Sequence, residues 1–588
     1  MKIKFIGHSY HISTGSSKFF IEILEKLGTV DTTWDEEWIK PEKRISLSDL
    51  EHYDLIVIWQ VPHIARRIPE ELKKKTVFVP MYDAVANIGA KFWRRLRGLR
   101  VICFSYTNFI ECKNNGLQCF YIQYFPEAGS VAKSFDTLRL FFWQRQEAPN
   151  WRTIAGYLPI AQFDCIHLHA AVDPGAGNFV RPLECEFQKF NIRVTQWFDN
   201  KQEFLRELDK SNVFFAPRQN EGIGMAMLEA MQRGMVCVGL NAPTMNEYIV
   251  HGLNGYLVPV EADECVHITD GQQIAANAAA MLATGRQRFE RQISDLYEFL
   301  TGEVLPKFRN VVSPALAKWR EARVSKIVRH ASKVPLATRP RAEAPRVSVI
   351  TVVRNDAIGL ARTVESVLGQ TYSDFEYWVV DGASTDRTKR LLKQLPGDRV
   401  SVVSAPDGGP YDAMNQAAQR ARGEFVIFIN AGDLFFSTRT LEFAMLDCPE
   451  DADIVYGHHV YVSKDRHCLA KRAQFLERTY SILKKGKLSY SWLDGIPCHQ
   501  ATFVRRSRLL QSPYDWRRYP IAADHDFLFR VLQAGAVTHH TNTIVSYYHG
   551  GGMSAKNLTR CVADWKAIAM CYTDDPVRAA KFYGEGSF

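Results

Sequence analysis

Short apolar runs alternate with helical patterns along most of this chain, most clearly after residue 346. Three runs are rich in β-branched and aromatic residues and almost free of charge: 347–353, 377–380 and 424–429. Such runs are typical of strands buried on both faces of a parallel sheet. Helical patterns lie between and after them, at 360–370, 385–395 and 411–422. The alternation predicts βαβ architecture, with ligands at the carboxyl ends of the strands.

The first half of the chain shows the same alternation. Strand-like runs lie at 2–7, 54–59, 76–80, 101–105, 138–142, 165–169, 213–216 and 236–240. Helical stretches lie between them, notably at 17–27, 223–233 and 271–284. This pattern predicts an α/β fold with two Rossmann-like lobes, a cleft between them and a break near residues 126–136.

Four motifs of the second half occur in the order and spacing of a known family. They are VVDGASTD at 379–386, PDGGPYDAMN at 406–415, FINAGD at 428–433 and AADHDFLFR at 522–530. Together they resemble the inverting family 2 glycosyltransferases, which have the GT-A fold, and within them a subgroup that builds bacterial surface polysaccharides. The resemblance implies an enzyme that uses nucleotide-sugar donors.

The resemblance also implies a donor pocket in the second half. Asp381 would hydrogen-bond the nucleotide base, and Asp407 would approach the base or the ribose. Thr351, Arg354 and Asn355 would line the same pocket.

A divalent ion is expected next to this pocket. The diphosphate of a sugar nucleotide is negatively charged, and Mg²⁺ or Mn²⁺ held by oxygen ligands neutralises it as the glycosidic bond breaks. Asp433 aligns with the metal-binding aspartate of the family, whereas Asn430 and Gly432 replace its two companion acids. His549 is therefore a candidate second ligand; the alternative is a histidine in a lid that contacts phosphate or nothing.

The general base is expected on the last motif. Asp524 would take the proton of the acceptor hydroxyl, and Asp526, two residues later, is the alternative. The segment Cys498–Ala501 resembles one that lines the acceptor side in the same subgroup.

The first half carries a different motif at residues 215–231. A strand ends, a glycine-containing turn follows at Gly222, and a helix begins near Ile223 with free N–H groups that suit a phosphate. Glu229 lies eight residues after Glu221, where a carboxylate can bond ribose hydroxyls. With the glycine-rich segments at 234–239 and 251–258, this half resembles the donor lobe of the retaining family 4 glycosyltransferases, which have the GT-B fold.

That resemblance implies catalysis by Glu221 without a metal cofactor, with Arg218, Gly222 and Glu229 also at the donor. The family usually places an arginine and, five residues later, a lysine against the donor phosphates. Arg145 supplies the arginine.

Two departures from the family pattern leave an alternative open. Position 150 is Asn instead of Lys, with Arg152 as an imperfect substitute, and residues 13–18 replace the family's glycine-pair loop. The alternative is a GT-B domain that is inactive and serves as a scaffold.

The positive charge of the chain is confined to one segment. The whole chain has a net charge of +9, and residues 307–346 hold eleven Lys and Arg against two Glu, so the remainder is neutral. Within it, 316–330 predicts a basic amphipathic helix, and 332–345 contains three prolines and predicts a linker. We therefore expect domains at 1–310 and 346–588, joined by 311–345. The helix either lies on an anionic membrane surface or packs on the first domain.

Other features narrow the location and the partners. The chain has no apolar run of eighteen residues, and its N-terminus predicts a first strand instead of a signal peptide. Its twelve cysteines form no Cys-x-x-Cys pair, which favours a reducing compartment. No nucleic-acid-binding motif is present. We therefore expect a cytoplasmic protein, peripheral at the inner face of the membrane.

These observations predict a bifunctional glycosyltransferase with one retaining and one inverting site. Its acceptor would be lipid-linked or an oligosaccharide, as in O-antigen or capsule synthesis. The alternative is a single inverting site on a GT-B scaffold that binds the acceptor.

Overall fold

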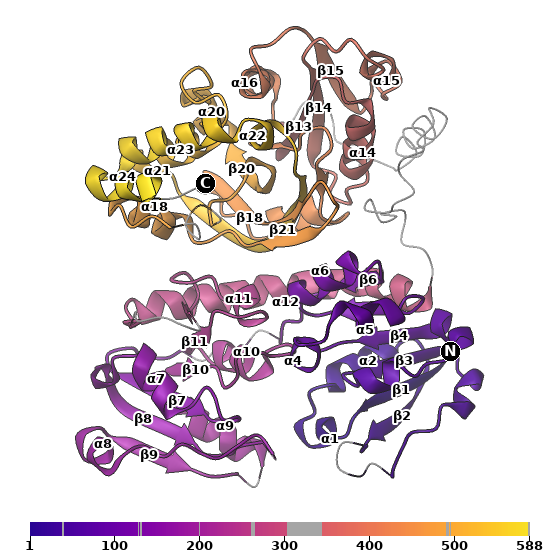
Figure 1. Cartoon of the computed structure of the whole chain (residues 1–588), viewed down its shortest axis with the longest axis vertical. Helices are drawn as coiled ribbons and strands as arrows, with labels where there is room; N and C mark the ends of the chain where they lie inside the picture. The colour runs from indigo at the N-terminus through magenta and orange to yellow at the C-terminus, as the bar shows by residue number, and fades with distance from the viewer. Residues whose placement is uncertain are drawn as a thin grey trace. The chain divides into compact units, whose positions relative to one another are not determined.

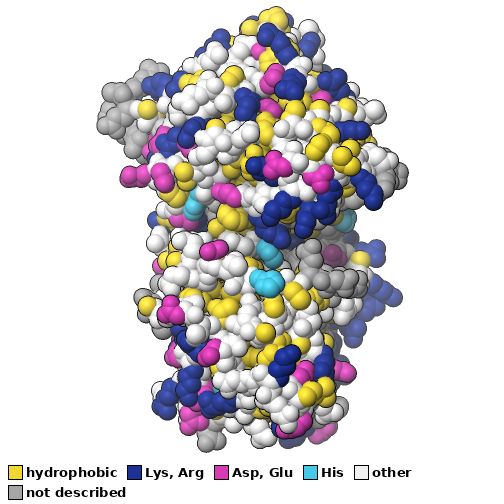
Figure 2. All heavy atoms as spheres, turned by 90° about the vertical axis from the view of Figure 1, so that its left-hand side faces the viewer, with side chains coloured by type: hydrophobic (Ala, Val, Ile, Leu, Met, Phe, Trp, Pro, Cys, Tyr) yellow, Lys and Arg dark blue, Asp and Glu magenta, His cyan; other side chains and the backbone are white. Residues whose placement is uncertain are grey.

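The computed structural model describes residues 1–588 except 38–39, 41, 128, 130–131, 174, 199, 260–264, 303–343, 490–492, 494 and 586–588. The chain forms two compact units, Met1–Lys307 and Phe308–Phe588. The predicted basic helix at 316–330 lies outside the described residues, as does the linker up to residue 343. Within the described ranges, every helix is too short or too polar to span a lipid bilayer. On the face shown in Figure 2, basic and acidic side chains are intermingled.

The N-terminal unit contains two parallel sheets, which confirms the predicted pair of Rossmann-like lobes. The first sheet has the order β2-β1-β3-β4-β5-β6. Its strands are β1 Lys2–His8, β2 Thr29–Asp35, β3 Leu55–Trp59, β4 Thr76–Val79, β5 Arg100–Cys103 and β6 Gln118–Tyr121. The second sheet has the order β12-β11-β10-β7-β8-β9. Its strands are β7 Leu138–Trp143, β8 Phe163–His169, β9 Ile192–Thr195, β10 Val213–Phe215, β11 Val236–Leu240 and β12 Tyr256–Val258.

Each strand order reverses direction once, between β1 and β3 in the first sheet and between β7 and β10 in the second. In open α/β sheets, ligands bind outside the carboxyl ends of the strands at such a point. The helices of this unit are α1 Tyr10–Thr14, α2 Lys18–Glu25, α3 Pro62–Ala65, α4 Tyr82–Val85, α5 Ala90–Arg95, α6 Tyr106–Asn114, α7 Trp151–Tyr157, α8 Glu184–Lys189, α9 Lys201–Asp209, α10 Met225–Gln232, α11 Met245–Tyr248 and α12 Gly271–Thr301.

The last helix of this unit, α12, joins the two lobes. It has 31 residues, whereas the sequence pattern predicted a helix only over 271–284. Its first half packs on α10 and β11, and its second half reaches β5 and β6 of the first lobe (Figure 1). There Arg100 donates hydrogen bonds to the carbonyls of Phe299 and Leu300, at 2.6 and 2.8 Å.

A buried glutamate makes a second connection between the lobes. Glu247 of α11 lies at the N-terminus of α6, where its carboxylate accepts the backbone N–H groups of Tyr106 at 2.6 Å and Thr107 at 3.1 Å. A carboxylate at this position satisfies unpaired N–H groups and meets the positive end of the helix dipole. One hydrophobic cluster also contains side chains of both lobes, among them Trp59 and Phe141.

The C-terminal unit is built on a mixed nine-stranded sheet, which confirms the predicted GT-A-like architecture. The order is β15-β14-β13-β16-β20-β18-β21-β17, with β19 paired to β18. Strands β13 to β16 are parallel to one another, and β20 runs antiparallel to β16. The strands are β13 Val347–Val353, β14 Phe375–Asp381, β15 Val400–Ser404, β16 Phe425–Phe428, β17 Leu434–Phe435, β18 Ile454–Val462, β19 Cys468–Lys471, β20 Thr502–Arg505 and β21 Thr538–His549.

Helices cover both faces of this sheet, as the two separate hydrophobic clusters on it require (Figure 1). They are α14 Ala357–Leu368, α15 Thr388–Leu392, α16 Pro410–Arg420, α17 Thr440–Met445, α18 Leu476–Lys484, α20 Arg506–Gln511, α21 Ala523–Gln533, α22 Met553–Lys556, α23 Leu558–Tyr572 and α24 Pro576–Glu585.

Candidate functional site

Asp381, the last residue of β14, is fully buried. Its carboxylate accepts the backbone N–H of Ser384 at 3.1 Å and hydrogen bonds from the hydroxyls of Ser384 and Ser404. Both oxygens are therefore engaged, by the loop that follows β14 and by the last residue of β15. The carboxylate joins that loop to the end of β15.

The other predicted donor-pocket residues divide between the core and the surface. Thr351 is fully buried, and its hydroxyl donates to the carbonyl of Ile429 at 2.8 Å, which ties β13 to the end of β16. Arg354 and Asn355 are exposed at the carboxyl end of β13. Asn355 has a φ of 56° and accepts the N–H of Thr385 at 2.8 Å. Arg354 and Asn355 thus lie at the accessible edge, with Thr351 beneath them.

Asp407 lies against the loop that follows β14, at Gly382. A Cβ atom added at Gly382 would be 2.6 Å from a carboxylate oxygen of Asp407 and 3.4 Å from Cδ of Arg354. A side chain at position 382 would therefore displace the carboxylate of Asp407. Arg354 and Asp407 thus both lie close to Gly382 at one edge of the sheet.

Asp433, the predicted metal ligand, is buried behind β16. One carboxylate oxygen accepts the backbone N–H of His549 at 2.8 Å, and the other accepts the side-chain amide of Gln500 at 2.9 Å. Burial raises the pKa of Asp433 to about 6, although these two hydrogen bonds act in the opposite direction. A cation bound here would relieve this cost of an uncompensated buried charge.

His549 ends β21 next to Asp433. Burial, and after it the guanidinium of Arg362, lowers the pKa of His549 to about 3, so its ring is neutral at physiological pH. Nε2 lies 3.1 Å from Arg362, whereas Nδ1 is buried without a hydrogen-bond partner. His549 therefore contacts Asp433 through its backbone N–H, and its Nδ1 is left without a partner.

His499 links two of the motifs. Its Nδ1 lies 3.0 Å from a carboxylate oxygen of Asp524, and its Nε2 lies 2.9 Å from the side-chain amide of Asn430. The next residue, Gln500, holds Asp433. Two consecutive residues thus connect the predicted base with the predicted metal ligand. The resemblance placed this segment at the acceptor side but gave His499 no role.

Asp524 is ionised in this setting. Burial alone would raise its pKa, but His525, His499 and Tyr411 together hold the pKa of Asp524 well below its usual range. The hydroxyl of Tyr411 donates to it at 2.8 Å. This carboxylate is therefore both charged and fixed in orientation.

Asp526 has a different environment. One oxygen accepts two hydrogen bonds from Arg530, at 3.2 and 3.0 Å, and the other accepts the hydroxyl of Tyr572 at 2.8 Å. Both oxygens are thus engaged within the helical layer. The two aspartates that the sequence left as alternatives therefore have distinct partners.

In the N-terminal unit, the two arginines predicted to bind the donor phosphates are hydrogen-bonded to the carboxylate of Asp173. Arg145, just beyond the carboxyl end of β7, donates to Asp173 at 3.1 and 3.0 Å. Arg218, beyond β10, also bonds Asp173 and lies 3.4 Å from Asp83 of the first lobe. Tyr10 of the first lobe donates to Asp173 at 3.2 Å. No motif marked Asp173 or Tyr10 in the sequence, because each becomes important only through contacts between distant segments.

Glu221 lies in the same region and is buried, with 8% of its surface exposed. Burial, and after it the charge of Glu221, raises the pKa of Asp83 to about 6. Several carboxylates and the side chains of Arg145 and Arg218 therefore lie together where the strand order of the second sheet reverses, between β7 and β10.

Two glycines of the motif at 215–231 have different structural reasons: close packing at Gly222 and backbone conformation at Gly224. A Cβ at Gly222 would lie 2.8 Å from Cβ of Met81 in the first lobe. Gly224 is the N-cap of α10 with a φ of 79°, a conformation that favours glycine. The helix begins at Met225, two residues later than predicted. Glu229 is half-buried on this helix.

A cavity of about 360 Å³ lies beside this motif. Its lining includes Pro149, Arg152, Tyr157, Gln219 and Leu240. These residues come from α7 and the turn before it, from the segment after β10 and from the last residue of β11.

Asn150, which stands where the family has a lysine, is the N-cap of α7. Its side chain accepts the N–H groups of Arg152 at 2.9 Å and Thr153 at 3.3 Å. The side chain of Arg152 contacts Glu186 at 3.4 Å and also lines the cavity. Arg152 thus borders the cavity and pairs with Glu186, whereas Arg145 and Arg218 pair with Asp173.

Comparison with known proteins gives two family matches. Residues 153–267 match the sequence model of glycosyl transferases group 1, and residues 348–510 match that of glycosyl transferase family 2. PGL/p-HBAD biosynthesis glycosyltransferases of Mycobacterium bovis and Mycobacterium tuberculosis are 33% identical over 219 residues, which cover 36% of this chain and 80% of theirs. An uncharacterized glycosyltransferase of Mycobacterium tuberculosis is 44% identical over 93 residues, 16% of this chain and 36% of that protein.

Two solved structures are also similar. HepE of Anabaena in complex with UDP and glucose shares 17% identity, covers 51% of this chain and 100% of its own, and gives a TM-score of 0.36. The mannosyltransferase PcManGT of Pyrobaculum calidifontis in complex with GDP-Man and Mn²⁺ shares 19% identity, covers 45% of this chain and 75% of its own, and gives a TM-score of 0.29.

Proposed function

Because the chain belongs to the nucleotide-sugar-dependent glycosyltransferases and joins a group 1 domain to a family 2 domain, we propose that it is bifunctional. The C-terminal half transfers one sugar with inversion, and the N-terminal half transfers another with retention. The observation that carries this proposal is a cluster of charged side chains at the carboxyl ends of the strands in each half. Joining two such sites keeps the product of one at high effective concentration for the other.

In the C-terminal half, Asp524 is the proposed general base. It takes the proton from the acceptor hydroxyl while that oxygen bonds the anomeric carbon, and the nucleoside diphosphate leaves with the electrons of the broken bond. Its ionised state and its hydrogen bonds to His499 and Tyr411 support this role. The engagement of Asp526 with Arg530 supports Asp524 over its neighbour.

Asp433 and His549 are the proposed ligands for Mg²⁺ or Mn²⁺ in this half. A bound divalent ion supplies positive charge for the departing diphosphate. The buried carboxylate of Asp433 and the Nδ1 of His549, which lacks a partner, support the assignment. Arg354, Asn355 and Asp407 are proposed to contact the donor nucleotide. Asp381 and Thr351 were expected to bond the base and to line the pocket; because both are fully buried, we propose instead that they hold the segments that carry the other three.

In the N-terminal half, the proposed donor site lies between Glu221 and the adjoining cavity. Arg145 and Arg218 neutralise the diphosphate, with the N–H groups after Gly222 as further donors, so that no metal is required. Glu229 bonds the ribose, and Glu221 acts at the sugar or at the charge that develops on it.

A second candidate function follows from the contacts of the two arginines. Both are already paired with Asp173, and Asn150 caps a helix where the family has a lysine. A donor would have to displace these ion pairs. The alternative is therefore a single inverting activity in the C-terminal half, with the N-terminal half as a scaffold that holds the acceptor.

For the acceptor, we propose a lipid-linked or oligosaccharide precursor of a bacterial surface glycan, such as O-antigen or capsule. The motifs of the second half and the basic segment at 307–346 support this assignment. The same segment supports peripheral binding at the inner face of the cytoplasmic membrane.

Nucleotide release from a panel of UDP- and GDP-sugars, measured on the full chain and on two variants, tests the proposal. Asp524→Asn disables the C-terminal site, and Glu221→Gln disables the N-terminal one. Two activities are expected: the one that remains in Glu221→Gln is sensitive to EDTA, and the one that remains in Asp524→Asn is not. If Asp524→Asn abolishes release from every donor, the scaffold function holds instead.

A further inference from the structure

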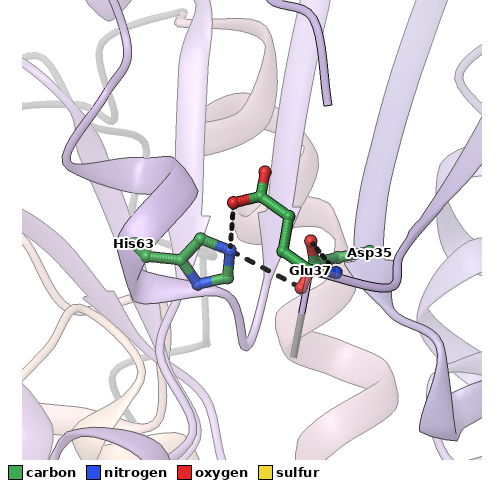
Figure 3. Close-up of side chains that lie close together, drawn as sticks. All are labelled: Asp35, Glu37 and His63. Atoms are coloured by element: carbon green, nitrogen blue, oxygen red, sulfur yellow. Dashed lines mark hydrogen bonds and ion pairs between the residues drawn. The ribbon is translucent and has the colours of Figure 1, made fainter. Parts of the chain in front are cut away.

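Three side chains at the edge of the first lobe form a cluster that glycosyl transfer does not explain. Asp35 is the last residue of β2, Glu37 follows two residues later, and His63 belongs to α3 (Figure 3). His8, the last residue of β1, lies opposite Asp35 in the strand register. The cluster therefore lies at the carboxyl edge of the sheet, where parallel strands deliver functional side chains.

The distances from the His63 ring to the two carboxylates are longer than those of ordinary hydrogen bonds. Nε2 of His63 lies 3.5 Å from Oδ2 of Asp35 and 3.8 Å from Oε2 of Glu37. One ligand atom from each residue lies within 4.8 Å of the other two. In a tetrahedral site with bonds of about 2.0–2.1 Å, ligand atoms are separated by about 3.4 Å. The spacing therefore resembles that of ligands around an ion.

A buried oxygen without a partner points into this space. Asp35 is fully buried, and its Oδ2 has no hydrogen-bond partner. Nε2 of His63, which faces it, also has none. An isolated buried carboxylate oxygen is costly unless it is paired or coordinates a metal. This oxygen is the second, independent indication of a ligand.

The remaining oxygens of the two carboxylates are anchored by other groups. Oδ1 of Asp35 accepts the N–H of Glu37 at 3.3 Å. Oε1 of Glu37 accepts Nη1 of Arg67 at 2.7 Å and the N–H of Ile45 at 3.1 Å. Each carboxylate is therefore held through one oxygen while the other faces His63, as outer hydrogen bonds orient the ligands of metal sites.

We propose that Asp35, Glu37 and His63 bind a divalent transition-metal ion, and that Zn²⁺ fits this ligand set best. Two carboxylate oxygens and one imidazole nitrogen leave a fourth position open for water or a substrate oxygen. With a neutral His63, the two carboxylates and Arg67 carry a net charge of −1, which a divalent cation reverses. The ion cross-links the end of β2 to α3, and its binding does not depend on whether the N-terminal half is catalytic.

Zinc content and cobalt absorption of the full chain test the proposal. The protein is stripped with EDTA, kept reduced, dialysed against Zn²⁺ and analysed for bound metal. Because the twelve cysteines and the C-terminal half can also take up metal, the informative quantity is the difference between wild type and His63→Ala. We expect one equivalent fewer in His63→Ala. The matched control His52→Ala, at an exposed histidine of the same lobe, keeps the wild-type content.

Co²⁺ distinguishes the ligand set, because oxygen and nitrogen ligands give visible d–d bands without the near-ultraviolet charge transfer of thiolates. We expect such bands in wild type and in His52→Ala, and weaker bands in His63→Ala and Glu37→Gln, where the C-terminal site alone still contributes. Glu37→Gln is included because the residue is partly exposed and the variant should fold; the far-ultraviolet circular dichroism checks this. Equal zinc content in wild type and His63→Ala would show that the cluster binds no metal and overturn the proposal.

Discussion

Nδ1 of His499 lies 3.0 Å from the carboxylate of Asp524, and because that carboxylate is ionised, the ring nitrogen is the donor. Nε2 lies 2.9 Å from the side-chain amide of Asn430. His499 thus connects the proposed base with the strand end that carries the predicted metal-binding motif.

The first prediction separates the two neighbouring aspartates. Asp524→Asn should lower kcat of the inverting transfer by about 100- to 10,000-fold, the usual contribution of a general base. Asp526→Asn removes a partner of Arg530 and should leave kcat near that of the wild type. Steady-state kinetics with an acceptor analogue measures both. The opposite ranking would assign the base to Asp526.

The second prediction concerns His499 as a positioning residue. His499→Ala leaves the buried Asp524 with one donor fewer, so the pKa of Asp524 rises and the acid limb of the pH–rate profile moves to higher pH. We expect a lower kcat with an almost unchanged KM for the donor. His499→Asn, which retains a side-chain donor, should recover part of the activity. If both variants keep the wild-type pH profile, His499 only supports the fold.

The third prediction follows from the pKa of Asp433, which burial raises from 3.8 to about 6. Because the folded-state pKa is above the unfolded value, the stabilisation is fully present below about pH 4 and is lost as the pH rises through 6. In EDTA, wild type should therefore lose up to about 3 kcal/mol over this window relative to Asp433→Asn.

Thermal unfolding of both proteins at pH 4 and pH 7 measures this difference. Mn²⁺ at pH 7 should stabilise wild type and not Asp433→Asn, because the ion binds the ionised carboxylate. The assignment of Asp433 as a metal ligand fails if Mn²⁺ raises the unfolding temperature of both proteins equally.

The fourth prediction tests the donor site of the N-terminal half. Arg145→Gln and Arg218→Gln should each weaken UDP binding about 10- to 100-fold, as expected for the loss of a charge-assisted hydrogen bond. Calorimetric titration in an Asp433→Asn background isolates this half. Arg193→Gln, on the surface of the same lobe, is the control. No UDP binding by the parent would favour the scaffold function.

The fifth prediction concerns the basic segment, which lies outside the described residues. Each Lys or Arg near an anionic leaflet contributes on the order of 1 kcal/mol, so we expect salt-sensitive binding to anionic liposomes and little to neutral ones. Replacing Lys318, Arg320, Arg323, Lys326 and Arg329 with Gln should abolish sedimentation with liposomes but not transfer to a soluble acceptor. Unchanged sedimentation would identify the segment as a linker.

The alternation of apolar runs predicted the central strands but missed the edges of the first two sheets. All eight strands predicted in the first half are present; β2, β6, β9 and β12 were not predicted, and they are the four edge strands. An edge strand is paired on one side and partly exposed, so its sequence lacks a continuous apolar run. In β2, for example, only Asp35 is fully buried.

The site residues were predictable where a short motif contained them. Asp433 and Asp524 stand in such motifs, and the structure adds their partners. Asp173, His63 and the hydrogen bonds of His499 could not be predicted, because each pairs with residues that are distant in the sequence. Only the fold determines which of these distant residues meet.

The passage of α12 from the second lobe to the first makes the N-terminal half one cooperative folding unit. Separate melting of either lobe would expose the apolar cluster that they share and break the bonds between Glu247 and α6. A nucleotide bound only to the second lobe should therefore slow amide hydrogen exchange in β4 and β5 as well. Occupancy of one lobe would thus be transmitted to the other as increased rigidity.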